Sequence, residues 1–377
     1  MHEPIYLDYN ATTPVAPEVA DAVDHAVREL WGNPSSTHVW GRRAREAVET
    51  SRAQVAELLG CEPDELIFTG GGTESDNAAI LGVAESLASR GRHIVISPVE
   101  HAAVDRPCRL LEARGYEVTR VGVDSDGRVR VSEAAAALRP ETVLVSIVHA
   151  QNETGVLQPV REIAELARAR GIVLHTDAAQ SVGKVPVDVR ELGCDLLTVA
   201  GHKLYAPKGI GALYVRRGTP FSGLLRGASH EGGRRAGTEN VPGIVGLGAA
   251  CELARRELPH RTAHLAALRD RLERLLLENL PTLVIHGSRA PRLPNTTSVA
   301  FPGAQAATLA AGAEGIGLSL GAACHSARPE VSHVLRAMGV GEELALGTLR
   351  LSVGTPTTPS EIDHAAARLV DAYRRQR

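Results

Sequence analysis

The chain has 377 residues, 44% hydrophobic and 23% charged, which is long enough for two domains and excludes the disordered and fibrous classes. Its 41 Lys and Arg residues nearly balance 44 Asp and Glu residues, and a net charge of -3 gives no general attraction to nucleic acid or anionic membranes. The five cysteines are far apart, and no segment approaches the roughly 18–20 apolar residues of a membrane span. We therefore expect a cytoplasmic protein that binds neither nucleic acid nor a membrane.

Short apolar segments alternate with helical patterns through the first two thirds of the chain. Strands are predicted at residues 66–68, 93–97, 142–148, 172–175, 195–199 and 211–215. In residues 161–171 the apolar side chains recur at helical spacing, which predicts a crossover helix between the third and fourth strands. The alternation indicates an α/β fold with a mostly parallel sheet, whose ligands bind at the C-terminal ends of the strands.

A long helix rich in Arg, Glu and Leu is predicted from about residue 253 to 280. We expect it to connect a large domain, residues 15–255, to a smaller α+β domain, residues 256–377, with the N-terminal segment 1–14 joining the two. Gly and Pro cluster between residues 201 and 246, where we expect loops to approach a functional site.

A glycine-rich turn follows the first predicted strand. Residues 69–77 read TGGGTESDN and lead into a helical pattern. Such a turn offers backbone N–H groups and a helix N-terminus to a phosphate, and Thr73 can add a hydroxyl donor. For this segment alone, a plain glycine turn with a capping residue is an equally good interpretation.

Polar residues also follow the fourth and fifth predicted strands. Asp177 and Gln180 come just after residues 172–175, and a buried acid there needs a partner such as the cationic ring nitrogen of pyridoxal phosphate. Taken alone, Asp177 is more simply an ordinary loop residue. Lys203 stands in a glycine-flanked turn, where an ammonium group is costly unless it is used covalently, as in a Schiff base. His202 can donate to a phosphate or can be a surface histidine.

Nine motifs run in a fixed order along nearly the whole chain. They are YLDYNATTP at 6–14, GNPSS at 32–36, GTESDN at 72–77, EH at 100–101, NETG at 152–155, DAAQ at 177–180, GHK at 201–203, GT at 237–238 and RLSVG at 350–354. In this order they resemble the cysteine desulfurase family of pyridoxal-phosphate enzymes, which is class V aminotransferase-like. The resemblance implies the aspartate-aminotransferase type of fold (fold type I), a homodimer and pyridoxal 5′-phosphate as cofactor, with no metal.

The resemblance also assigns roles to single residues. Lys203 would hold the cofactor covalently, Asp177 would face its ring nitrogen and His101 would stack on its ring. The other cofactor contacts would be Gln180 and Asn152 at the ring oxygen and Gly72, Thr73 and His202 at the phosphate, with Thr238 reaching the phosphate of the neighbouring subunit. Asn152 and Arg350 would bind the substrate, whose carboxylate suits the guanidinium of Arg350.

Cys324 lies among small residues in GAACHSAR at 321–328, where His325 and Arg328 favour the thiolate. We interpret the cysteines at 61, 108, 194 and 251 as buried apolar residues. The resemblance makes Cys324 the nucleophile, on a long loop. L-cysteine would become L-alanine, His101 would move the thiol proton, and a persulfide on Cys324 would pass to an acceptor protein, for example in iron–sulfur cluster assembly.

One departure and two alternatives accompany this hypothesis. Ala200 stands where many family members have a serine that binds the phosphate, and the lost hydrogen bond is worth about 1 kcal/mol. Residues 175–180, 237–240 and 320–326 also resemble selenocysteine lyase, which would act on L-selenocysteine. A non-enzymatic sulfur-delivery scaffold is a third hypothesis, against which Lys203 and Asp177 argue.

Overall fold

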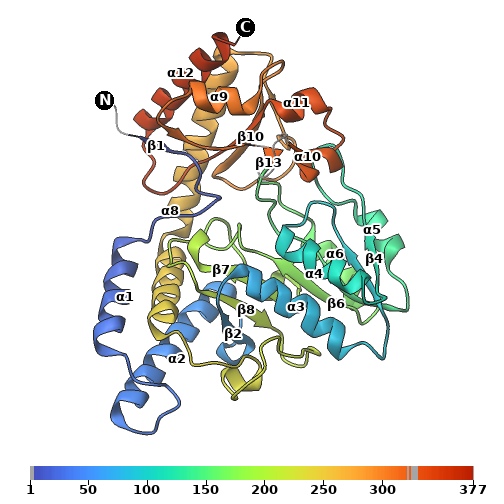
Figure 1. Cartoon of the computed structure of the whole chain (residues 1–377), viewed down its shortest axis with the longest axis vertical. Helices are drawn as coiled ribbons and strands as arrows, with labels where there is room; N and C mark the ends of the chain where they lie inside the picture. Colours follow the sequence, from blue (N-terminus) through green and yellow to red (C-terminus); the bar gives the residue numbers. More distant parts are fainter. Residues whose placement is uncertain (1–3, 321, 324–329, 377) are drawn as a thin grey trace.

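A computed structural model describes residues 4–320, 322–323 and 330–376, so Cys324 lies outside the described residues. A larger α/β part and a smaller C-terminal part are connected by one long helix (Figure 1). Within the described residues, no helix is long and apolar enough to cross a membrane.

The larger part is built on a seven-stranded sheet, counted within the described residues. Across the sheet the strands are β2 (Leu66–Thr69), β8 (Gly211–Val215), β7 (Leu196–Ala200), β6 (Val173–Asp177), β5 (Thr142–Ser146), β3 (His93–Ile96) and β4 (Glu117–Arg120). Only β8 runs against its neighbours, and the other pairs are parallel, so the predicted mostly parallel sheet is confirmed. The sequence did not predict β4, an edge strand whose residues are exposed or half-buried.

Side chains alternate between the two faces of the sheet, as the pleat of a strand requires. In β2, Leu66 and Phe68 pack on one face and Ile67 on the other. The face of Ile67 is covered by α3 (Gly72–Ser86) and α4 (Ala102–Glu112). The other face is covered by α2 (Val39–Leu59), α6 (Val160–Arg168) and the first half of α8 (Val241–Asn279). The remaining helices of this part are α1 (Pro17–Glu29), α5 (Val131–Ala137) and α7 (Val189–Leu192).

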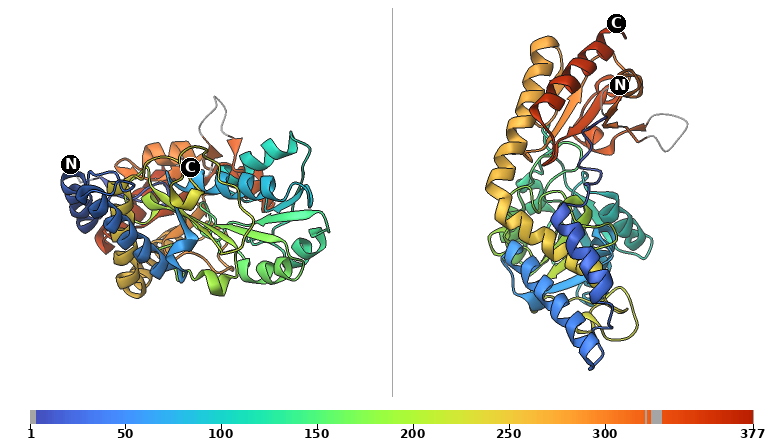
Figure 2. Two further views of the ribbon diagram at one scale, coloured as in Figure 1. Left: turned by 90° about the horizontal axis from the view of Figure 1, so that it is seen from below. Right: turned by 90° about the vertical axis from the view of Figure 1, so that its left-hand side faces the viewer.

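Helix α8 extends along one side of the molecule and reaches both parts (Figure 2). It begins at Val241, whereas the sequence predicted a start near residue 253. The glycines of its first turns suggested a loop, but they allow close packing. A Cβ atom built on Gly248 would lie 2.6 Å from the Cβ of Ser51 in α2.

The C-terminal part has its own four-stranded sheet and core within the described residues. Its strands are, in order, β12 (Ser319–Leu320), β15 (Thr348–Ser352), β10 (Thr296–Ala300) and β9 (Val284–Ile285). Its helices are α9 (Ala306–Gly312), α10 (His333–Ala337), α11 (Glu342–Leu346) and α12 (Pro359–Arg374). Two short pairs complete it, β1 (Ile5–Tyr6) with β11 (Ile316–Gly317) and β13 (Ala322–Ala323) with β14 (Glu330–Val331). Ile5 and Leu7 are buried in this core, so the N-terminal segment contacts it; the domain boundary at residue 255 stays a prediction.

Candidate active site

A cavity of about 610 Å³ lies at the C-terminal edge of the larger sheet. It is lined by residues that follow β2, β3, β5, β6 and β7, together with Asn10 to Thr12 of the N-terminal segment and Arg350 of β15. Its lining includes nine of the residues that the sequence singled out: Gly72, Thr73, His101, Asn152, Asp177, Gln180, His202, Lys203 and Arg350. Segments far apart in the sequence thus converge where a parallel sheet binds its ligands.

The glycine-rich turn presents the start of α3 to this cavity. Gly71 precedes the helix with φ of 142°, a conformation that side chains rarely adopt, and no side chain caps the helix there. The carboxylate of Glu74 instead accepts from the backbone N–H of Gly70 at 2.7 Å and from Arg235 at 3.0 Å. The positive end of α3 therefore faces the cavity, where it can attract an anion.

Lys203 follows β7 in a short 3-10 turn, Gly201–Lys203. Its Nζ donates to the backbone carbonyls of Asn10 and, at 2.8 Å, Ala11. Burial and then the Arg350 guanidinium lower the pKa of this amine to about 8, although Asp177 opposes the shift. The amine therefore loses its proton more readily than an ordinary lysine, and its neutral form can act as a nucleophile or a base.

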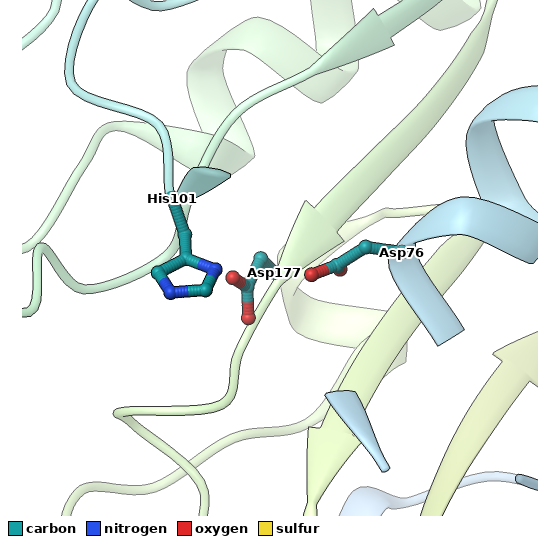
Figure 3. Close-up of side chains that lie close together, drawn as sticks. All are labelled: Asp76, His101 and Asp177. Atoms are coloured by element: carbon teal, nitrogen blue, oxygen red, sulfur yellow. The ribbon is translucent and has the colours of Figure 1, made fainter. Parts of the chain in front are cut away.

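Asp177 ends β6 and lies beside two other titratable side chains, Asp76 of α3 and His101 (Figure 3). One carboxylate oxygen from each acid and one ring nitrogen of His101 lie within 4.8 Å of one another. Burial, and then the charge of Asp177, raise the pKa of Asp76 well above its usual range. Two buried carboxylates so close cannot both ionise readily. Burial also raises the pKa of Asp177, but the backbone N–H of Ala179, His101 and Lys203 oppose that shift, so we assign the proton to Asp76 and the negative charge to Asp177.

His101 caps the N-terminus of α4, because its Nδ1 accepts the backbone N–H of Ala103 at 3.2 Å. Burial lowers the pKa of His101. With Nδ1 occupied as an acceptor, Nε2 carries the proton of the neutral ring and is the atom free to exchange it.

Asn10 links the cavity to both parts of the molecule. Its carbonyl accepts Gln180 Nε2 at 2.9 Å, and its Nδ2 donates to the carbonyl of Asn152 at 3.2 Å and to Thr296 Oγ1 at 2.8 Å. The position of Gln180 and Asn152 in the cavity therefore depends on the N-terminal segment.

Arg350 reaches the cavity from β15 of the C-terminal part. Its Nη2 donates to Asp8 Oδ1 at 2.7 Å and its Nη1 to the carbonyl of Asn152 at 3.1 Å. Its Nε is buried and has no hydrogen-bond partner within the described residues. Arg350 itself lines the cavity, and its planar guanidinium suits an anionic group such as a carboxylate.

Of the predicted site residues that the structure describes, Thr238 lies elsewhere. Thr238 is exposed and lines a separate cavity of about 240 Å³ with Phe68 and Arg235. Cys324 lies outside the described residues. The other four cysteines are buried and free, as expected, and burial raises the pKa of each thiol.

Sequence reasoning did not assign a role to Asp76 or Asn10. Both belong to motifs that the sequence singled out, GTESDN and YLDYNATTP. Only their positions in the sequence pointed to a role. Asp76 is an acid in the second helical turn after the glycine-rich loop, and Asn10 is an amide in a segment far from any predicted strand. Their burial arises only in the folded chain.

Comparison with known proteins gives consistent results. Residues 5–364 match the family model described as aminotransferase class-V. The chain is 45% identical over 366 residues to a cysteine desulfurase IscS of Dictyoglomus turgidum, which covers 97% of this chain and 93% of that protein. It superposes with a TM-score of 0.91 on a structure described as a NifS-like protein, 36% identical, with 98% of both chains covered. A structure described as SspA in complex with cysteine gives a TM-score of 0.84 at 34% identity and covers 94% of this chain and 100% of that one.

Proposed function

The chain belongs to the aminotransferase class-V family and is a cysteine desulfurase, and from this premise we propose that Lys203 holds pyridoxal 5′-phosphate and that Cys324 accepts the sulfur of L-cysteine. The observation that carries the proposal is the meeting of Lys203, Asp177 and His101 in one cavity, beside the exposed start of α3.

The cavity fits this cofactor in several independent ways. The first turn of α3 and Thr73 would hold the phosphate, because Gly71 leaves the helix end open. Lys203 supplies an amine of lowered pKa for the covalent bond, and Asp177 a buried anion for the ring nitrogen. His202 adds a ring whose pKa burial lowers to about 4, so it is a neutral donor or acceptor at neutral pH. Gln180 and Asn152 would contact the ring oxygen.

When bound, the cofactor provides an electron sink that makes the Cβ–S bond of cysteine breakable. Asp177 would hold the proton of the ring nitrogen in place, since its charge is not shared with the neutral Asp76. The freed Lys203 amine would remove the proton from the substrate α-carbon and later return one. The Nε2 atom of His101 would exchange the proton of the substrate thiol.

Arg350 would bind the substrate carboxylate and so fix the sulfur relative to the attacking thiolate. The Cys324 thiolate would then attack that sulfur, so that an S–S bond forms while the Cβ–S bond breaks and leaves its electron pair on the carbon side. Protonation of Cβ gives L-alanine, and Cys324 is left as a persulfide. The persulfide would pass to an acceptor protein.

We further propose a homodimer in which Thr238 completes the phosphate site of the second copy. The loop that carries Thr238 adjoins the loop between α1 and α2, because Ser35 Oγ lies 3.4 Å from His230 Nδ1. Trp31 in the loop after α1 and Trp40 in the first turn of α2 are exposed, at 66% and 47%, with ring centroids 6.0 Å apart. Exposed aromatic clusters of this kind are typical of protein interfaces.

Two variants test the proposed chemistry. Lys203→Ala should remove the visible absorbance of the bound cofactor and all alanine formation. Cys324→Ala should keep that absorbance, and its change on adding L-cysteine, but lose alanine formation. Alanine release from L-cysteine at an undiminished rate in Cys324→Ala would refute the transfer step. Wild-type activity confined to L-selenocysteine would refute the choice of substrate.

A further inference from the structure

Lysine is rare in this chain and is confined to one place. The 41 Lys and Arg residues include only three lysines, Lys184, Lys203 and Lys208, and all the others are arginine. Lys203 and Lys208 line the cavity, and Lys184 donates to Gln180 and Asn10, which also line it. Arginine stays charged in proteins, whereas a buried lysine can lose its proton. Lys184 and Lys203, both with lowered pKa, therefore indicate where this chain uses an amine rather than a guanidinium.

Lys184 is the lysine that the proposed chemistry leaves unexplained. It lies in the turn after β6, is only 5% exposed and does not itself line the cavity. Its Nζ donates to Gln180 Oε1 at 2.8 Å and to Asn10 Oδ1 at 3.4 Å. Among the residues that the structure describes, no carboxylate forms an ion pair with it. A buried ammonium without a counter-ion is strongly disfavoured.

The two charged groups that act on Lys184, Lys203 and Arg350, are both cationic. The nearby Arg261 is paired with Glu257 at 3.1 Å. Lys203 follows β7, Arg350 comes from β15, and Arg261 of α8 donates to the carbonyl of Gly183 at 3.4 Å. Burial, followed by Lys203 and Arg350, lowers the pKa of Lys184 well below its usual value. A neutral amine has two N–H donors, which matches its two acceptors.

We propose that Lys184 is a positioning residue of the cofactor site, an uncharged amine that fixes the side chains of Gln180 and Asn10 beside Lys203. Because Lys184 donates to Gln180 Oε1, the NH₂ end of that amide is the end directed toward the Asn10 carbonyl. Lys203 donates to the same carbonyl. By holding the side chains of Asn10 and Gln180, Lys184 therefore helps to position the Asn10 carbonyl that accepts from Gln180 and from Lys203. An arginine in this place would add a fixed charge next to Lys203. The inference rests on the proposed function, in which Gln180 and Lys203 contact the cofactor.

The charge of Lys184 can be measured in the wild-type holoenzyme. Protein labelled with ¹³C at the lysine ε-carbons gives one signal for each of three lysines, with exposed Lys208 as the reference and Lys184→Met as the assignment control. The Lys184 signal should have the chemical shift of an uncharged amine at pH 7.5. A charged Lys184 at that pH would overturn the proposal. This titration decides the question even if Lys184→Met does not fold.

The positioning role is tested by the absorbance of the bound cofactor. Lys184→Met keeps the length of the side chain but removes both donors, so cofactor affinity should fall roughly tenfold. The pH at which the visible absorbance changes should also shift. Thr262→Val is the matched control, because it removes only the hydroxyl that donates to the Lys184 carbonyl at 2.9 Å, and it should leave that pH unchanged. Wild-type affinity and an unshifted pH in Lys184→Met would refute the inference while the proposed function stands. A wild type that binds no pyridoxal phosphate would refute both.

Discussion

At the scale of single residues, the site depends on an amine at Lys203 that has lost its proton. Burial and Arg350 lower the pKa of Lys203 to about 8, so the amine is mostly charged below this pH and mostly neutral above it. Only the neutral amine attacks the aldehyde of pyridoxal phosphate. The rate at which cofactor-free protein takes up the cofactor should therefore rise with pH and reach half its maximum near pH 8, as followed by visible absorbance. Half-maximal uptake near the ordinary lysine value of about 10.4 would contradict this.

Arg350 offers a second test at this scale. In Arg350→Lys a single ammonium replaces the planar guanidinium, so the KM for L-cysteine should rise roughly 10- to 100-fold. Arg292→Lys is a suitable control, because Arg292 pairs with Glu273 at 2.8 Å outside the cavity, and its KM should equal that of the wild type. Alanine formation at a series of L-cysteine concentrations gives both values. An unchanged KM in Arg350→Lys would show that another group binds the carboxylate.

Much of the cavity lining could be named from the sequence, because polar residues after predicted strands must gather at one edge of a parallel sheet. Asp177, Lys203 and the glycine-rich turn were found in this way. Lys184 was not, since a lysine in a loop is normally exposed and its burial depends on α8 and the N-terminal segment. Asp76 was not assigned for the same reason, because only the fold brings it beside Asp177.

At the scale of elements, the end of β7 and the start of α3 form the proposed phosphate site together. They approach closely, since a Cβ atom built on Gly72 would lie 3.1 Å from the Cβ of Ala200. Ala200→Ser would add a hydroxyl donor at this point. One hydrogen bond is worth about 1 kcal/mol, so the dissociation constant of pyridoxal phosphate should fall about fivefold. A fluorescence titration of cofactor-free protein measures it, and unchanged or weaker binding would argue against a phosphate beside Ala200.

The strands and helices differ in how well the sequence pattern predicts them. Buried strands such as β5 and β7 were predicted because they are continuous apolar runs. The edge strand β4 has the sequence EVTR, whose charged ends resemble a loop. The start of α8 was missed because its glycines, which suit a turn, here allow contact with α1 and α2. Tertiary packing overrides local preference in both cases.

At the scale of the whole molecule, the proposed dimer shares its active sites. Lys203→Ala and Thr238→Ala homodimers should each be inactive or strongly impaired. After subunit exchange, each mixed dimer has one site with both changes and one site with neither, so alanine formation should recover to about a quarter of the wild-type rate if exchange is random. Size-exclusion chromatography of differently tagged subunits verifies the exchange. No recovery in verified mixed dimers would show that Thr238 acts within its own subunit, and an unimpaired Thr238→Ala homodimer would show that it does not act in the site.

The covalent use of Lys203 is the claim on which the whole account depends, and the rarity of lysine makes it directly measurable. Sodium borohydride converts a bond between lysine and pyridoxal phosphate into a stable secondary amine, and peptide mass spectrometry then locates the added mass. With three lysines in the chain, each candidate falls at a distinct sequence position. We expect the added mass on Lys203 alone. Its presence on Lys184 or Lys208, or its absence from all three in protein saturated with the cofactor, would contradict the account.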